Sequence, residues 1–347
     1  MYRKFRHFIL FLITLGLSAC LDEIELNVDS NESFLVVSGE ITTNPGPYQI
    51  ELARSAKFSS GAAGIPDRVR GASITLKDDQ GNEAPFFEVD DGVYQTIPDA
   101  IQGTVGRSYY VEIEVDGQRY QSQPEKILPV VSSQSLGISF RNETTVNEAG
   151  NFTEVNLVTV LVDTEFPSDS AFLKWNTFGI YEFGEISSQG NINPDICYVT
   201  ETIDFDNVAI ASAEASNGPL LQGKEVLTRT VDFRFSAAYC FNVIQQSITK
   251  AAYEFWSAVS DEFERNGNIF ETPPGKIRGN IVNSDNPEEE VLGIFTASAV
   301  DTMQLFVTPA EVGTPIPRCR PFPRPTDACF NCLSLPNSTL EKPSCWN

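Results

Sequence analysis

Residues 109–121 read Tyr109-Tyr110-Val111-Glu112-Ile113-Glu114-Val115-Asp116-Gly117-Gln118-Arg119-Tyr120-Gln121 and carry a strand pattern on either side of a turn signal. Apolar and polar side chains alternate along its first half, which is the pattern of a strand buried on one face. Asp116-Gly117 is a two-residue turn signal typical of hairpins, and the strand pattern resumes behind it. The stretch therefore predicts two antiparallel strands joined by a tight turn.

The same signals recur on the N-terminal side of this hairpin. Strands are predicted at residues 34–41, 48–52, 72–76, 86–89 and 93–96, with turns rich in glycine, proline, asparagine and aspartate between most of them. Residues 55–69 are predicted to form a loop. Short strands separated by frequent turns favour a β-sandwich over residues 33–128. Strand number and spacing alone make this first domain similar to a transthyretin-like or immunoglobulin-like module.

A second β-rich domain is predicted over residues 129–314, behind a proline-bounded segment. Its strands are expected at residues 136–140, 154–162, 171–181, 197–203, 226–235, 276–282, 291–299 and 302–307. One amphipathic helix is expected at residues 243–265, because apolar side chains recur there at helix-like spacings. The predicted fold is mainly β, with two β-sandwich domains and this helix packed on the second through Phe255, Val259 and Phe263.

The N-terminus has the organisation of an export leader. A basic segment is followed by an apolar core at residues 8–17, too short to span a bilayer, which ends in Leu17-Ser18-Ala19-Cys20. This pattern is the lipobox of bacterial lipoproteins, in which the cysteine receives a diacylglyceride before residues 1–19 are removed as a signal peptide. We expect a mature chain that begins at lipidated Cys20 and is held at a membrane by acyl chains such as palmitate. An ordinary signal peptide that happens to end in a cysteine is the alternative.

Acidic residues follow this cysteine at once, in a linker predicted over residues 20–32. Asp22, Glu23 and Glu25 resemble the signal that exports lipoproteins of the Bacteroidota through the outer membrane to the cell surface. A solvated acidic linker on a protein of the periplasmic leaflet is the alternative. The chain carries a formal net charge of −23, which opposes binding to nucleic acid because that binding depends on cationic contacts.

The only histidine, His7, leaves with the leader. The mature chain therefore lacks the base of Ser-His-Asp and Cys-His catalysis and every histidine ligand of a zinc site. No catalytic residue, cofactor or metal ligand is predicted from the sequence. We interpret the protein as non-enzymatic. The alternative is a surface hydrolase that acts on glycans or peptides with a pair of carboxylates.

Six cysteines remain after Cys20. They are Cys197, Cys240, Cys319, Cys329, Cys332 and Cys345. An even number of cysteines in an exported chain fits a disulfide framework, whose connectivity the sequence leaves open. Four of them lie in a proline-rich tail at residues 315–347, which we expect to be irregular and held by bridges. The Cys-x-x-Cys at residues 329–332 alternatively suggests a redox dithiol or half of a zinc site, but the context that either site requires is missing.

Several segments together resemble one family of proteins. They read Val37-Ser38-Gly39-Glu40-Ile41, Tyr253-Glu254-Phe255-Trp256, Gly279-Asn280-Ile281 and Gly293-Ile294-Phe295-Thr296-Ala297-Ser298, with further matches at residues 71–76, 267–274 and 329–332. The chain is similar to the Bacteroidota lipoproteins of domain-of-unknown-function family 4249 over essentially the whole mature sequence. It departs at the extreme end, where Cys345 stands. Genes for such proteins commonly lie beside genes for TonB-dependent receptors. The resemblance therefore implies an accessory or ligand-capture role for a non-enzymatic surface lipoprotein beside a TonB-dependent outer-membrane receptor.

Overall fold

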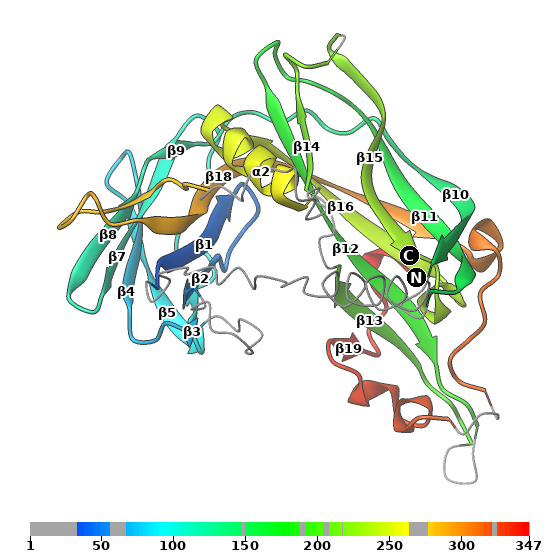
Figure 1. Cartoon of the computed structure of the whole chain (residues 1–347). Coiled ribbons are helices and arrows are strands. Elements are labelled where there is room, and N and C mark those ends of the chain that lie inside the picture. The colour runs from blue at the N-terminus through cyan, green and yellow to red at the C-terminus, as the bar shows by residue number, and fades with distance from the viewer. Residues whose placement is uncertain are drawn as a thin grey trace, which may run out of the picture. The chain divides into compact units, whose positions relative to one another are not determined.

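Strands make up most of the described chain (Figure 1). The computed structural model describes residues 33–55, 67–146, 150–187, 192–203, 208–216, 218–263, 277–320 and 325–346. The predictions for the signal peptide, Cys20, the linker at residues 20–32 and much of the loop at residues 55–69 lie outside these residues. The mainly β prediction is confirmed, with one large mixed sheet and one smaller sheet.

The N-terminal strands follow the predicted order closely. They are β1 (Leu35–Thr42), β2 (Gln49–Arg54), β3 (Asp67–Arg68), β4 (Ser73–Asp78), β5 (Glu83–Asp90), β6 (Val93–Thr96), β7 (Ser108–Val115), β8 (Gln118–Ser122) and β9 (Glu125–Lys126). The predicted hairpin is β7 paired with β8, and Val115 stands opposite Gln118. Its two turn residues, Asp116 and Gly117, both have left-handed backbone angles, with φ of 53° and 73°. Aspartate and glycine are the residues that such a turn requires.

Alternate residues of β7 build the first hydrophobic core. Tyr109, Val111, Ile113 and Val115 are buried, whereas the glutamates between them are not. The same core also takes five buried residues from the far end of the chain, namely Ile281, Val291, Phe295, Ala297 and Ala299. Residues far apart in sequence therefore complete the N-terminal core.

The second half of the chain contributes strands to both sheets. The small sheet has the order β10-β11-β15, formed by β10 (Ser135–Val146), β11 (Phe152–Glu165) and β15 (Leu220–Thr230). The large sheet takes β12 (Phe172–Gly184), β13 (Ile196–Thr202), β14 (Ala209–Ser212), β16 (Tyr239–Ile248), β17 (Ile281–Asn283), β18 (Val291–Val307) and β19 (Ser338–Thr339). A second core lies among β11, β12, β13, β16 and the tail.

Strand β18 joins the two halves of the large sheet. Its first part pairs in parallel with β1, from Val291 opposite Leu35 to Ser298 opposite Thr42. Its second part pairs antiparallel with β16. The two strands predicted at residues 291–299 and 302–307 are thus one continuous strand. The described residues from Phe34 onward belong to one compact unit, and the domain boundary near residue 128 stays a prediction.

The predicted helix is shorter than expected and buries less. Helix α2 spans Lys250–Phe263, whereas residues 243–248 belong to strand β16. Tyr239, Phe241 and Val243 alternate into the second core, so a period of two governs this segment. The prediction that the helix buries Phe255, Val259 and Phe263 is wrong. Phe263 is 55 % exposed and the other two are half-buried, because only one narrow stripe of the helix faces the sheet.

Short helical turns complete the chain. They are η1 (Phe233–Phe235), η2 (Pro309–Val312), η3 (Asp327–Cys329), η4 (Cys332–Ser334) and η5 (Ser344–Trp346). The last three lie in the tail, whose other described residues are irregular apart from β19, in agreement with the prediction. Within the described part of the chain, no helix is both long and apolar enough to cross a membrane.

Candidate functional site

The predicted lipidation and export residues have no structural test. Cys20, Asp22, Glu23 and Glu25 all lie outside the described residues, so their roles stay predictions.

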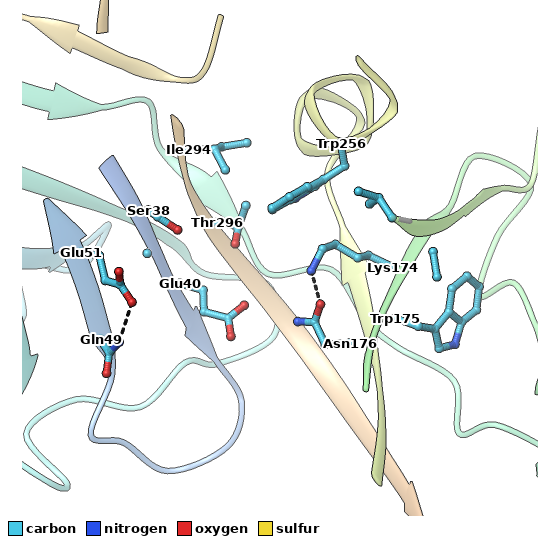
Figure 2. A pocket seen from close by; sticks show the side chains of 13 residues that line it. Ser38, Glu40, Gln49, Glu51, Lys174, Trp175, Asn176, Trp256, Ile294 and Thr296 are labelled. Atoms are coloured by element: carbon cyan, nitrogen blue, oxygen red, sulfur yellow. Dashed lines mark hydrogen bonds between the residues drawn. The ribbon is translucent and has the colours of Figure 1, made fainter. Parts of the chain in front are cut away.

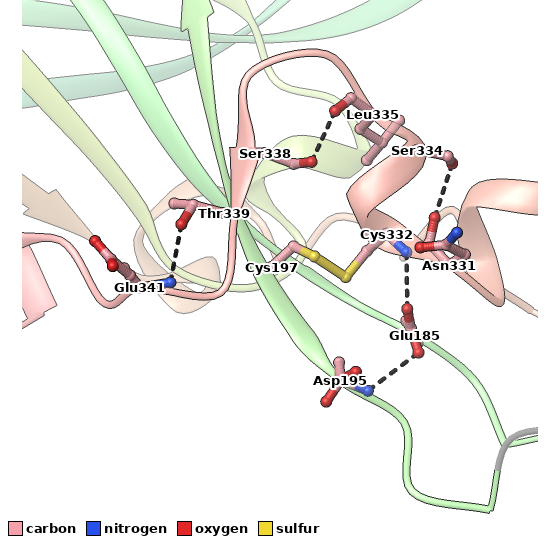
Figure 3. The surroundings of a disulfide bond; sticks show 10 residues. All are labelled: Glu185, Asp195, Cys197, Asn331, Cys332, Ser334, Leu335, Ser338, Thr339 and Glu341. Atoms are coloured by element: carbon pink, nitrogen blue, oxygen red, sulfur yellow. Dashed lines mark hydrogen bonds between the residues drawn. A yellow bond between two sulfur atoms is a disulfide. The ribbon is translucent and has the colours of Figure 1, made fainter.

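The six remaining cysteines form three disulfides. They are Cys197–Cys332, Cys240–Cys345 and Cys319–Cys329. The two cysteines of the Cys-x-x-Cys motif therefore bond to different partners and not to each other. Figure 3 shows how Glu185 supports the first bridge, since its carboxylate accepts hydrogen bonds from the backbone N–H of Cys332 at 2.7 Å and of Asp195 at 3.1 Å. In the residues that the structure describes, no cluster of three or more histidine, cysteine, aspartate or glutamate side chains could hold a metal ion.

A row of polar side chains crosses four neighbouring strands of the large sheet. Its members, which we call the polar row, are Lys174 on β12, Gln246 on β16, Ser298 on β18 and Glu40 on β1. Lys174 stands directly opposite Gln246 in the register, and its Nζ donates to Gln246 Oε1 at 3.2 Å. Gln246 Nε2 donates to Glu40 Oε2 at 2.8 Å and lies 3.4 Å from Ser298 Oγ. One amide side chain thus links the lysine to the glutamate.

The position of Lys174 follows from the alternation along β12. Leu173 and Trp175 face the second core, whereas Phe172 on the opposite face packs with the cluster under α2. Lys174 shares the face of Phe172, because side chains two residues apart point the same way along a strand. Asn176 is the next residue on this face, and Lys174 Nζ donates to its Oδ1. A lysine is therefore held under a helix in a strand that is buried on both faces.

Helix α2 places an aromatic ring over this lysine. The start of helix α2 is fixed by Thr249. The Thr249 Oγ1 accepts a hydrogen bond from Ala252 N at 3.2 Å and donates one to the buried Glu125 at 2.7 Å. A hydroxyl that caps the first turn in this way stabilises the helix end. Nζ of Lys174 lies 4.6 Å from the centre of the Trp256 ring, a cation–π contact (Figure 2).

A cavity of about 280 Å³ opens beside these residues (Figure 2). Its polar lining residues are Ser38, Glu40, Gln49, Glu51, Lys174, Asn176 and Thr296, and its other lining residues are Gly39, Trp175, Val208, Ala209, Trp256 and Ile294. It therefore combines one cation, two carboxylates, amides, hydroxyls and an indole ring. A concave site of this mixed character is typical of small-ligand binding.

Burial lowers the pKa of the Lys174 amine to about 8, while the nearby charge of Glu40 acts in the opposite direction. The cause is the loss of hydration, which penalises the charged form of a buried amine. Only 8 % of the residue is exposed.

The chain matches the family described as a domain of unknown function, DUF4249, over residues 21–304. It belongs to this family. No curated protein matches the chain.

The DUF4249 resemblance and the cavity meet in the same segments. Glu40 comes from the Val37–Ile41 segment, Trp256 from the Tyr253–Trp256 segment, and Ile294 and Thr296 from the segment at residues 293–298. Glu40, Lys174 and Trp256 are not among the site residues predicted from the sequence. The sequence does contain a signal for Lys174, because this lysine interrupts an otherwise apolar run in a predicted strand. A buried lysine is rare without a specific partner, so its position indicates a special role.

Proposed function

We propose that this DUF4249 protein is a non-enzymatic, lipid-anchored lipoprotein of the outer-membrane surface that captures a small ligand for a TonB-dependent receptor. The observation that carries the capture role is the cavity between Trp256, Lys174 and Glu40. The anchor rests on the lipobox at Cys20, and the receptor rests on the family resemblance. Surface exposure rests on Asp22, Glu23 and Glu25, with the periplasmic leaflet as the alternative location.

The chemistry of the cavity favours binding over turnover. Lys174 Nζ is engaged by two amide oxygens and covered by an indole ring, so its amine is not free to attack a substrate. The hydroxyls of Ser38 and Thr296 reach the cavity, but the mature sequence offers no histidine base to activate them. The same groups are well suited to hold a ligand by hydrogen bonds, charge and stacking.

One observation favours the alternative of a carboxylate-based hydrolase of glycans or peptides. Glu40 and Glu51 line the same cavity from adjacent strands. Glu51 stands opposite Ser38 in the register, which makes it a diagonal neighbour of Glu40 with Cβ atoms roughly 7 Å apart. In glycosidases the two carboxyl groups themselves lie roughly 5–9.5 Å apart, a separation that two glutamate side chains with this Cβ spacing can adopt. Glu51, however, is held by Arg68 Nη1 at 2.7 Å and by Gln49 Nε2 at 3.1 Å.

Activity measurements separate the two functions. The purified chain is incubated with surface glycans and with peptides, beside a Glu40→Gln variant that keeps the shape of the side chain. Capture predicts no turnover by either protein. Turnover by the wild-type chain that disappears in Glu40→Gln would establish the hydrolase instead.

Affinity purification tests the receptor. The tagged protein is recovered from detergent-solubilised membranes, and capture for a receptor predicts a TonB-dependent receptor in near-stoichiometric amount. Cys20→Ala serves as the matched control, because loss of the lipid should release the protein from the membrane fraction. Recovery of the lipoprotein alone, with unchanged uptake in a deletion strain, would refute the partnership. Protection of the wild-type protein from protease added to intact cells would move it to the periplasmic leaflet.

A further inference from the structure

The charge of Lys174 is not neutralised by a contacting acid. Within the described part of the chain, no carboxylate oxygen lies within 4.0 Å of its Nζ, since no ion pair involving this lysine is formed. Its hydrogen-bond acceptors are the amide oxygens of Asn176 and Gln246, and its third neighbour is the ring of Trp256. The Glu40 carboxylate contacts Gln246, the residue whose amide oxygen accepts from Lys174, and no contact of Glu40 with the lysine amine is formed among the described residues.

A buried cation of this kind is costly unless it finds a counter-ion. Amide dipoles and an indole face compensate part of the lost hydration, but a full opposite charge compensates far more in a low-dielectric site. The lowered pKa of the Lys174 amine agrees with incomplete compensation. The lysine also lines the cavity, so a ligand can supply what the protein does not.

The other residues that line the cavity indicate which chemical groups an anionic ligand needs besides its charge. Trp256, Ile294, Val208 and Ala209 form apolar surface near the lysine. A ligand that brought only a small inorganic anion would leave this surface exposed to water. A short apolar body attached to the anionic group would cover it and gain the free energy of apolar burial.

We propose that this cavity binds a small monocarboxylate, with the carboxylate against Lys174 Nζ and an apolar body against Trp256. The inference rests on the proposed capture function and names its ligand class. The acidic character of the whole chain opposes any anion at long range, but ions at physiological strength screen charges beyond about 8 Å. The contact with Lys174 itself is inside the cavity and is screened much less.

The test uses three probes that share one body and differ in charge. They are 3-phenylpropionate, 3-phenylpropanol and 3-phenylpropylamine, titrated into the purified full chain by calorimetry and by tryptophan fluorescence. We expect the carboxylate to bind at least about tenfold more tightly than the alcohol, and the amine to bind no better than the alcohol. The assignment would be overturned if the amine bound more tightly than the carboxylate. It would also be overturned if the Kd of the carboxylate were above about 10 mM.

Two variants locate the carboxylate. Lys174→Met keeps an unbranched side chain beside Trp256 and should lose the preference for the carboxylate over the alcohol. Lys224→Met is the matched control, since Lys224 is a partly buried lysine on β15 that does not line the cavity, and it should keep the preference. Equal loss in both variants, or none in Lys174→Met, would place the ligand elsewhere.

A third variant provides an independent test of the carboxylate position if Lys174→Met misfolds. Glu40→Gln removes the negative charge nearest to the lysine and retains its hydrogen-bonding ability toward Gln246. It should raise the affinity for 3-phenylpropionate severalfold, because a repulsion is removed, and a fall in that affinity would contradict the proposed position of the carboxylate. These titrations contain no receptor, so their failure is distinct from a failure to recover the receptor.

Discussion

Replacing Lys174 by methionine should change how stability depends on pH. In the folded chain the pKa of this amine is about 8, against 10.5 for the same group in water. Between these two values the unfolded chain holds the proton and the folded chain does not. Stability therefore rises with pH across this interval, since it rises wherever the unfolded state binds more protons. The lysine reduces stability most below pH 8, where folding must bury the charge.

The magnitude follows from the two pKa values. A difference of one pKa unit corresponds to about 1.4 kcal/mol, so burial of the charged form costs about 3 kcal/mol. Lys174→Met should remove this cost and gain additional apolar contact with Trp256. The variant should be the more stable protein at pH 7, and its advantage should shrink by about 3 kcal/mol as the pH approaches 10.5.

Urea denaturation of both proteins at several values between pH 7 and pH 10.5 measures this difference. Burial raises the pKa of tyrosines such as Tyr48 and Tyr94 in the folded chain. Tyrosine ionisation in the unfolded chain therefore lowers stability near the upper end of the range, but this effect is common to both proteins and cancels in the comparison. Lys126→Met, which removes an exposed lysine from β9, is the matched control and should differ from the wild type by the same amount at every pH. A constant difference between wild type and Lys174→Met would show that the lysine charge is solvated or paired, and the reasoning about its buried charge would be refuted.

Four further outcomes are expected. Removing the Cys240–Cys345 bridge with two serines should destabilise the chain by about 3–4 kcal/mol in urea, somewhat less than its 105-residue separation alone implies, because the interleaved Cys197–Cys332 bridge still restrains the unfolded chain. Alkylation without reduction should modify none of the six bridged cysteines in an intact-mass spectrum. Glu125→Gln should flatten the pH dependence on the acid side, because burial raises the pKa of the Glu125 carboxyl, so that stability falls as the pH rises from the unfolded pKa through the folded one. Thr249→Ala should cost about 1 kcal/mol of unfolding free energy by removing the cap of α2, and no change would mean that the hydroxyl cap does not stabilise the helix.

The predictable parts of the fold are those that neighbouring residues determine. The hairpin at residues 109–121 could be predicted because alternation and an Asp-Gly turn are both local signals. The helix prediction is wrong for residues 243–248, which belong to strand β16. Both faces of this strand are buried, so polar residues such as Asn242 and Gln246 do not mark a solvent face. Their partners are side chains on other strands. A sequence pattern that records only apolar and polar positions cannot show this kind of burial.

The candidate site could not be predicted for a related reason. Lys174, Gln246 and Glu40 are brought together by the pairing of β12 with β16, of β16 with β18 and of β18 with β1. Each of these pairings joins segments that are distant in sequence. The pairing of β18 with β1 is also parallel, so no hairpin turn in the sequence indicates it. The lipid anchor at Cys20, which stays a prediction, differs in that its whole signal lies in consecutive residues.

The polar row depends on both parts of strand β18, so it can form only late in the assembly of the sheet. Glu40 belongs to the first strand of the sheet, whereas Lys174 and the helix that carries Trp256 belong to the second half of the chain. The polar row is complete only when β1 has paired with the first part of β18 and β16 with its second part. A fragment that ends before residue 291 would therefore retain the hairpins of the first half but could form no cavity. A carboxylate bound between Lys174 and Trp256 would stabilise the folded chain, because it would bind the assembled sheet and not the unfolded chain.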